Sequence, residues 1–245
     1  VGGRPAAGAG VSRRPCRRAK PSRYTRAMDD LFLHACCGPC ATVAVPAWRA
    51  EGVEPRLWYR NPNIQPLAED ERRRESLLRF AAAEAVVVAG AEATVTAGTG
   101  ECAGAARCDE RAFALPKEGT DAGARGAEWR AWAASLADTP REARCGACLR
   151  LRLGDTAAAA AAAGATRFST TLSVSPYQRH DLILVAGRTA AAEHGVEFVY
   201  LDLRERFRAS YAESRRLGLY RQPYCGCAAS KWEAWLQRRA GRAAS

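Results

Sequence analysis

Three tight groups of cysteines constrain this chain more than any other feature of its sequence. Seven of the ten cysteines belong to them: Cys36, Cys37 and Cys40; Cys145 and Cys148; Cys225 and Cys227. Thiolates are soft ligands, and groups this tight are typical of zinc or iron–sulfur sites. We therefore expect the fold to bring turns from separate elements to one place.

Other uses of these thiols fit the pattern less well. Isolated cysteines such as Cys16, Cys102 and Cys108 fit the role of small buried hydrophobic residues, but three clusters do not. A disulfide framework is disfavoured because the chain is long, rich in alanine and without an apolar signal segment. One structural zinc would use four ligands and leave three thiols unexplained. Our hypothesis is a four-cysteine iron–sulfur cluster together with a second metal.

Segments of strand length, the first of them the apolar run 31–35, alternate with helical segments along the chain. Strands are predicted at 31–35, 55–59, 85–88, 167–172 and 197–201, and helices at 40–51, 69–83, 148–163, 176–194 and beyond 205. This alternation predicts an α/β, Rossmann-like three-layer fold with a mostly parallel sheet of about five strands. We expect residues 28–245 to form a single catalytic domain, with 90–144 as a helical insertion or lid. The sequence has neither a Gly-x-Gly-x-x-Gly nor a Walker motif, which argues against a standard nucleotide site.

The net charge of +11 is concentrated at the amino terminus. Residues 1–27 hold eight basic and no acidic side chains, so the remainder carries 29 basic against 26 acidic residues, a net +3. We predict that 1–27 is a disordered basic tail. The tail either attracts phosphates without specificity or reflects a misassigned start before Met28. No apolar stretch reaches the ~20 residues that a membrane span needs, and we expect a cytoplasmic protein.

Polar side chains follow several of the predicted strands. The first cysteine group lies at the carboxyl end of the first strand, where α/β proteins place ligand sites, and the next helix would favour its thiolates. Later strands are followed by Asn61, Asn63, Thr170, Thr171, Ser173, Asp202 and Arg204. Local roles also fit: turns for the asparagines, a surface ion pair for Asp202 and Arg204, and an N-cap for Ser175 before Pro176.

Six short motifs, in this order, resemble one known family. They are Leu33–Cys40 (LHACCGPC), Tyr59–Ile64 (YRNPNI), Arg144–Leu153 (RCGACLRLRL), Phe168–Pro176 (FSTTLSVSP), Asp202–Arg204 (DLR) and Tyr220–Ser230 (YRQPYCGCAAS). The chain resembles the QueH family of cobalamin-independent epoxyqueuosine reductases from about Leu31 to the C-terminal helix. Departures are Gln65 in place of a common histidine, the absence of the usual tyrosine from 67–74, and a poorly matched 90–144.

The resemblance implies reduction of epoxyqueuosine to queuosine at the wobble position of a tRNA anticodon, the last step of queuosine biosynthesis. It also implies a 4Fe-4S cluster and an additional mononuclear iron, and we expect the seven cysteines to hold both, in a division that the sequence leaves open. Asp202 and Tyr220 are candidate proton donors. Candidate substrate contacts are Asn61, Asn63, Thr170, Thr171, Ser173, Arg204, Arg221, Gln222 and Lys231.

The partners implied are the tRNA anticodon stem-loop, read as splayed single-stranded RNA, and an electron donor that the sequence does not identify. Two other functions remain open at this point. One is a different iron–sulfur tRNA-modifying activity, such as thiolation, which the lack of a phosphate-binding loop for ATP disfavours. The other is a zinc-stabilised RNA-binding module without catalysis.

Overall fold

Four parallel strands form the sheet, in the order β2-β1-β3-β4. The computed structural model describes residues 31–89, 131, 135–136 and 139–243. The strands are β1 (Leu31–His34), β2 (Pro55–Trp58), β3 (Arg167–Thr170) and β4 (Glu197–Phe198). In the register of the sheet, His34 lies between Trp58 and Thr170, so the carboxyl ends of β2, β1 and β3 meet at one edge. The predicted α/β fold with a parallel sheet is confirmed.

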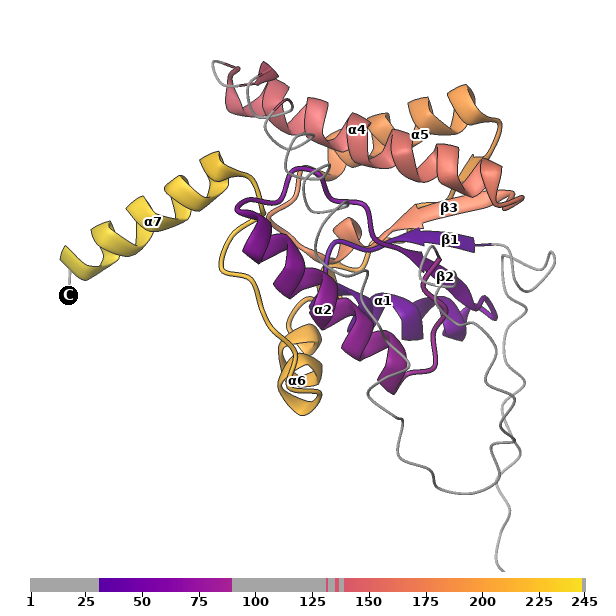
Figure 1. Cartoon of the computed structure of the whole chain (residues 1–245), viewed down its shortest axis with the longest axis horizontal. Coiled ribbons are helices and arrows are strands. Elements are labelled where there is room, and N and C mark those ends of the chain that lie inside the picture. Colours follow the sequence, from indigo (N-terminus) through magenta and orange to yellow (C-terminus); the bar gives the residue numbers. More distant parts are fainter. Residues whose placement is uncertain (1–30, 90–130, 132–134, 137–138, 244–245) are drawn as a thin grey trace, which may run out of the picture.

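Helices cover both faces of this sheet (Figure 1). One face carries α1 (Gly38–Ala50) and α2 (Leu67–Ala83), and the other carries α4 (Arg141–Ala162) and α5 (His180–His194). Beyond β4 the chain forms α6 (Ala209–Arg216), which packs on α1, and α7 (Ala228–Ala243), which extends away from the layers. Two short 3₁₀ helices, η3 (Thr171–Val174) and η4 (Arg204–Arg206), follow β3 and β4. None of the helices in the described ranges has the length and apolar content that crossing a bilayer requires.

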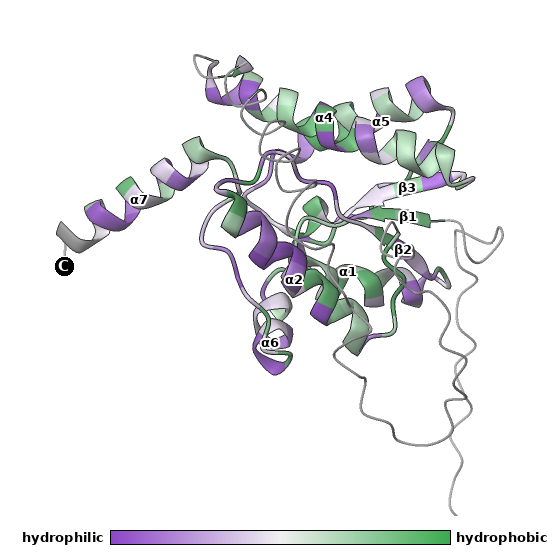
Figure 2. Cartoon of the chain, in the orientation of Figure 1, coloured by the Kyte–Doolittle hydropathy of each residue, from purple (hydrophilic) through white to green (hydrophobic). Residues whose placement is uncertain are grey.

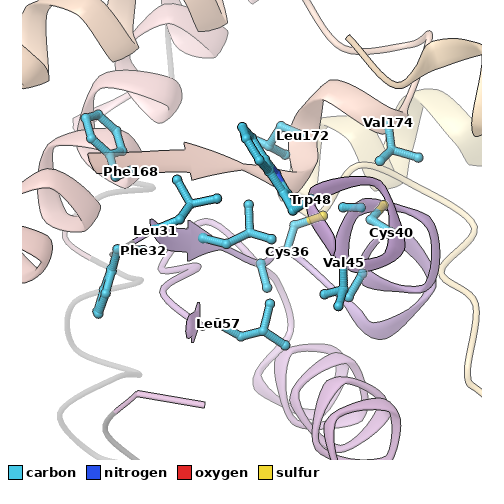
Figure 3. Packing of buried hydrophobic residues seen from close by; sticks show 14 of the residues in the cluster. Leu31, Phe32, Cys36, Cys40, Val45, Trp48, Leu57, Phe168, Leu172 and Val174 are labelled. Atoms are coloured by element: carbon cyan, nitrogen blue, oxygen red, sulfur yellow. The ribbon is translucent and has the colours of Figure 1, made fainter. Parts of the chain in front are cut away.

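The core lies between the sheet and its helices. All four residues of β1 are buried, as expected for a central strand with both faces covered, and Figure 2 shows this strand as strongly hydrophobic. Figure 3 shows Leu57 and Phe168 from the neighbouring strands and Trp48 from α1 in the same cluster. Cys36 and Cys40 belong to this cluster too, so the first cysteine group is built into the core rather than onto the surface.

The predicted strand at 85–88 is wrong, and the sheet formed by the described residues has four strands rather than about five. Only Val88 forms a bridge, to Leu57 of β2. The Leu57 N–H donates to the carbonyl of Val87 and the Ala89 N–H to that of Leu57, both at 2.8 Å. The segment follows α2 after a short turn, in which the Val86 N–H donates to the carbonyl of Ala81, and its pairing with β2 is a single bridge.

Two helix starts differ from the prediction. Helix α4 begins at Arg141 instead of 148, and α5 begins at His180 instead of 176. Ser175 is therefore not the N-cap of α5; its hydroxyl accepts a 3.3 Å hydrogen bond from the Tyr177 N–H within a turn. The predicted tail 1–27 and most of the predicted insertion 90–144 lie outside the described residues, so both stay predictions, as does the single catalytic domain.

Candidate metal centre

Cys36, Cys37 and Cys40 form the first thiol group. Their sulfur atoms all lie within 4.8 Å of one another, and all three side chains are buried. The group forms where β1 ends and the chain turns into α1, with Cys37 at the N-cap and Cys40 in the first turn. The positive end of the helix dipole therefore points toward the sulfurs and favours thiolate. The sequence prediction for this group is confirmed as a set of side chains that could hold a metal.

Gly38 allows α2 to pack closely against this turn. A Cβ atom at Gly38 would lie 2.4 Å from the backbone oxygen of Ser76 in α2, which is far inside normal contact. Any side chain at this position would therefore push the start of α1 away from α2. Because Gly38 directly follows Cys37, the displacement would move the thiols as well.

We expect Gly38→Ala to lower the free energy of unfolding by about 1–3 kcal/mol, the range for overpacked sites, and to lower the metal content. Gly154→Ala is the matched control, because a Cβ at Gly154 in α4 meets no atom within 4 Å. The control should stabilise the protein by about 0.5–1 kcal/mol, since alanine favours a helix over glycine. Chemical denaturation and metal analysis check both variants. Equal stability of Gly38→Ala and the parent would contradict the close approach.

The three thiols differ in how easily they ionise. Hydrogen bonds from Cys37 and Cys40 hold the pKa of Cys36 well below its usual value; Arg152 and Thr171 lower it further, against the effect of burial. The hydrogen bond between Cys37 and Cys36 raises the pKa of Cys37 to about 12. The hydrogen bonds of Cys40 with Cys36 and Cys37 raise the pKa of Cys40 well above its usual value. One buried thiolate thus has two protonated neighbours, and a metal bound by all three would displace their protons.

The second thiol group comes from two distant elements. Cys145 and Cys148 lie three residues apart on one face of α4, inside the helix rather than at its start as predicted. Cys225 and Cys227 flank Gly226, whose φ of 148° lies in the region that favours glycine, just before α7. Burial raises the pKa of Cys145 and raises that of Cys148 to about 12, and the thiols of Cys225 and Cys227 add to both effects. Within the described ranges, no three of these four sulfur atoms lie within 4.8 Å of one another, unlike those of the first group.

A buried arginine, Arg152, interacts electrostatically with thiols of both groups. The Arg152 side chain is only 2% exposed, and its Nη2 donates a 2.6 Å hydrogen bond to Oδ1 of Asn61. Among the described residues it has no ion pair with a carboxylate. Burial alone would lower the pKa of Arg152, but the thiols of Cys148, Cys36 and Cys225 raise it above its usual value. The counter-charge of this guanidinium is therefore the cysteine site itself.

A second buried arginine, Arg73, holds the loop of Cys225. Its Nη1 donates to the carbonyl of Cys225 at 2.8 Å and its Nη2 to that of Tyr224 at 3.1 Å. Its Nε pairs with Glu69 at 2.8 Å, and Glu69 also accepts a 2.7 Å hydrogen bond from the Tyr220 hydroxyl. The prediction from sequence missed both arginines. Arg152 carried a signal, since it lies one helical turn after Cys148, but Arg73 carried none.

The polar residues after β3 contact the site from inside the protein. The Thr171 hydroxyl accepts from the Cys36 N–H at 3.2 Å and lies 3.6 Å from the Cys36 sulfur. The Thr170 hydroxyl bonds Nδ1 of His34 at 2.9 Å, and the Ser173 hydroxyl donates to the carbonyl of Thr170. All three are buried, so they position the cysteine turn, and their contact with a substrate stays a prediction.

His34 is neutral and is fully engaged within the protein. Burial, followed by Arg152, lowers the pKa of His34 to about 3. Its Nε2 donates to the carbonyl of Arg60 at 3.2 Å, so Nδ1 accepts from Thr170. With both ring nitrogens bonded, His34 braces the end of β1 and does not serve as a metal ligand.

The remaining predicted residues fall into two sets. Asp202 and Arg204 are exposed and pair with each other, and this pairing keeps the pKa of Asp202 below its usual value. Lys231 is also exposed, on α7. By contrast, Gln222 reaches the site, because its Nε2 donates to the Cys37 sulfur at 3.0 Å. Arg221 is engaged by α6, where its Nη1 donates to Ser210 and Ser214.

The donor set fits a thiolate-bound metal group. All seven thiols are free, and two buried arginines offset the negative charge that ionised thiols would carry. Three buried polar atoms around the site also lack a hydrogen-bond partner among the described residues: Arg152 Nε, Gln222 Oε1 and Asn63 Oδ1. Buried polar atoms are rarely left unpaired, so these three are suited to a bound group.

Comparison with known families gives a match over most of the chain. The family described as Epoxyqueuosine reductase QueH matches residues 31–113 and 107–233. A protein of that name from Dehalococcoides mccartyi is 32% identical over 203 residues, which cover 83% of this chain and 93% of the relative. A protein of the same name from Thermotoga maritima is 28% identical over a match that covers 84% of this chain and 92% of the relative. A third, from Haemophilus influenzae, is 27% identical over a match that covers 81% of this chain and 70% of the relative.

These matches span the same segments that build the site. The family match includes all three cysteine groups, the two buried arginines and Gln222. The relatives are named as reductases, which makes this chain an oxidoreductase. The chain belongs to the QueH family of epoxyqueuosine reductases.

Proposed function

We propose that this enzyme reduces epoxyqueuosine to queuosine at the wobble position of tRNA, using a 4Fe-4S cluster and an additional mononuclear iron held by the seven cysteines. The observation that supports the proposal is the buried group of Cys36, Cys37 and Cys40, whose sulfur atoms all lie within 4.8 Å of one another at the end of β1. Cys145, Cys148, Cys225 and Cys227 complete the proposed set of ligands. A single zinc would leave three of these thiols without a role. We also propose that the enzyme acts in the cytoplasm, where its tRNA substrate is found.

The reaction removes the epoxide oxygen as water and consumes two electrons and two protons. When bound, the metal centres supply the electrons singly and a Lewis acid for the departing oxygen. The electrons originate from an external one-electron donor. The part of the protein is to hold the substrate against the site, to exclude water and to supply the protons.

Of the two candidate proton donors, Tyr220 is the one that carries a proton at neutral pH. Burial, followed by its bond to Glu69, raises the pKa of Tyr220 to about 12, so the hydroxyl stays protonated at neutral pH. Asp202 is paired with Arg204 and its pKa is lowered, so it is a carboxylate at neutral pH. We therefore propose that Tyr220 donates a proton and that Asp202 orients Arg204 toward the RNA.

The unpaired polar atoms near the cysteine site support a proposal for where the modified base binds. Gln222 donates to the Cys37 sulfur and keeps its Oε1 unpaired, and Asn63 keeps Oδ1 unpaired beside Gly226. A base with hydroxyl and amine groups can donate hydrogen bonds to both acceptors. We propose that these two side chains orient the substrate, while Arg204 and Lys231 contact the phosphates of the anticodon stem-loop.

Anaerobic incubation with a tRNA that carries epoxyqueuosine, a chemical reductant and no ATP tests the activity. We expect the modified nucleoside to lose the mass of one oxygen, as measured by mass spectrometry of the digested tRNA. Enzyme from which the iron has been removed is the control and should leave the nucleoside unchanged. A colourless protein that holds one tightly bound zinc and produces no mass change would refute the proposal and favour an RNA-binding module. A requirement for ATP would instead favour another tRNA-modifying activity.

A further inference from the structure

Three aromatic side chains form a row on the surface beyond the cysteine site. Tyr177 comes from the turn before α5, Phe207 from the turn before α6, and Tyr211 from α6 itself. The ring centroids of Tyr177 and Phe207 lie 5.7 Å apart and those of Phe207 and Tyr211 5.3 Å apart, both edge to face. Tyr177 is 79% exposed and Tyr211 41% exposed. We call these three residues the aromatic row; it leaves two tyrosines open to a ligand.

The surroundings of the aromatic row are positively charged. The guanidinium carbon of Arg221 lies 3.5 Å from the centre of the Tyr211 ring, and hydrogen bonds to Ser210 and Ser214 hold it there. The segment 204–216 carries five arginines and two glutamates, a net charge of +3. Exposed Arg206 and Arg208 flank Phe207 directly. A ligand that is both aromatic and anionic fits this surface.

The aromatic row lies next to the cysteine site. Gln178, the neighbour of Tyr177 in the chain, donates from Nε2 to the Cys225 sulfur at 3.3 Å. Gln222, the neighbour of Arg221, donates from Nε2 to the Cys37 sulfur at 3.0 Å. Tyr177 and Arg221 are therefore each followed in the chain by a glutamine that contacts a cysteine sulfur. A substrate whose reacting base enters the site would place the adjoining bases over the aromatic row.

We propose that the aromatic row is a stacking surface for unpaired bases of a single-stranded RNA loop. Bases stack on the rings of Tyr177 and Tyr211, and the arginines of 204–216 contact the phosphates between them. The identity of this loop as the tRNA anticodon rests on the proposed function. Exposed ring faces match the π-faces that all bases share, and positive charge matches the phosphate backbone, so RNA fits this surface better than a protein partner does.

Binding of an unmodified anticodon hairpin to the metal-loaded enzyme at one fixed salt concentration tests the proposal. We expect Tyr177→Ala to weaken binding about tenfold, within the range that the loss of one base stack produces, and Tyr177→Phe to bind like the parent. Because Tyr177 is 79% exposed, its truncation should leave folding and iron content unchanged, and both are measured. Val185→Ala is the matched control, since Val185 is 62% exposed on α5 and is not part of the aromatic row.

Unchanged hairpin binding by Tyr177→Ala would overturn the proposal. A second result would also overturn it: the variant binds RNA normally, a small electron-transfer protein reduces it more slowly than the parent, and dithionite reduces both at the same rate. The surface would then be a binding site for a protein partner. The hairpin carries no epoxyqueuosine, so this assay is independent of turnover. An enzyme that binds the hairpin through Tyr177 but does not reduce epoxyqueuosine would refute the proposed activity and keep the stacking surface.

Discussion

Cys36→Ser is expected to abolish reduction of epoxyqueuosine and to leave the purified protein deficient in iron. Cys36 has the lowest pKa of the three thiols in its group and contacts the Cys37 sulfur at 3.6 Å, so it is the thiolate on which a metal would first bind. Serine is a poor ligand for iron at neutral pH because its hydroxyl stays protonated. The loss should exceed the roughly 10–100-fold that changes outside the ligand shell produce.

Iron analysis, the visible absorption spectrum and single-turnover kinetics under anaerobic conditions measure this result. Cys108→Ser, which removes a thiol outside the three groups, is the matched control and should retain iron and activity. A Cys36→Ser protein with full iron content and the turnover of the parent would show that the first thiol group packs in the hydrophobic core and does not bind the metal. Cys148→Ser, measured in parallel, reports on the second group.

Arg152→Met is expected to weaken metal binding by about 10–100-fold and to lower the midpoint potential of any centre that still assembles. Arg152 is buried, and its counter-charges are the thiols of Cys148, Cys36 and Cys225. Methionine fills similar space without the charge, so ionised thiols would be left uncompensated in a site with little water. An electron added to a less positive site is less stable, which sets the sign of the change in potential.

Arg150→Met is the matched control, because Arg150 lies on the same helix but is exposed. Arg152→Lys should give an intermediate result, since it keeps the charge but loses the planar guanidinium that reaches Asn61. Iron content and redox titration distinguish a role in charge compensation from one in folding alone. An Arg152→Met protein that holds normal iron at an unchanged potential would contradict the charge assignment.

Much of the fold was predictable because β1 is an apolar run of strand length, and because short segments of strand length alternate with helical segments after it. The third predicted strand, 85–88, was wrong for a reason that its amino-acid composition does not reveal. Three valines at 86–88 favour a strand, yet they follow α2 so closely that their pairing with β2 is limited to the single bridge between Val88 and Leu57. The start of α4 was missed because its first turn is polar, although Pro140, which stands at the N-cap, is a signal that could have found it.

The thiols of the site were predictable, but their electrostatic partners were not. Tight spacing marks cysteines as ligands wherever the fold places them. An arginine on a helix, by contrast, is usually at the surface, and nothing in the sequence of α2 distinguishes buried Arg73 from exposed Arg72 or half-buried Arg74. Burial of a charge is decided by the packing of distant segments. In this protein the loop of Cys225 packs on α2 and covers Arg73.

The three cysteine groups are also widely separated along the chain, and this has a consequence for how the protein keeps its shape. A metal centre that joins them would act as a cross-link and close two loops, one of roughly 100 residues and one of roughly 75 residues, which is the range where restricting the unfolded chain gives substantial stabilisation. The segment around Cys225 otherwise relies on Arg73 and a few neighbouring contacts. Chelation should therefore lower the melting temperature and expose the C-terminal segment to proteases first, so that the cofactor would maintain the architecture as well as perform the chemistry.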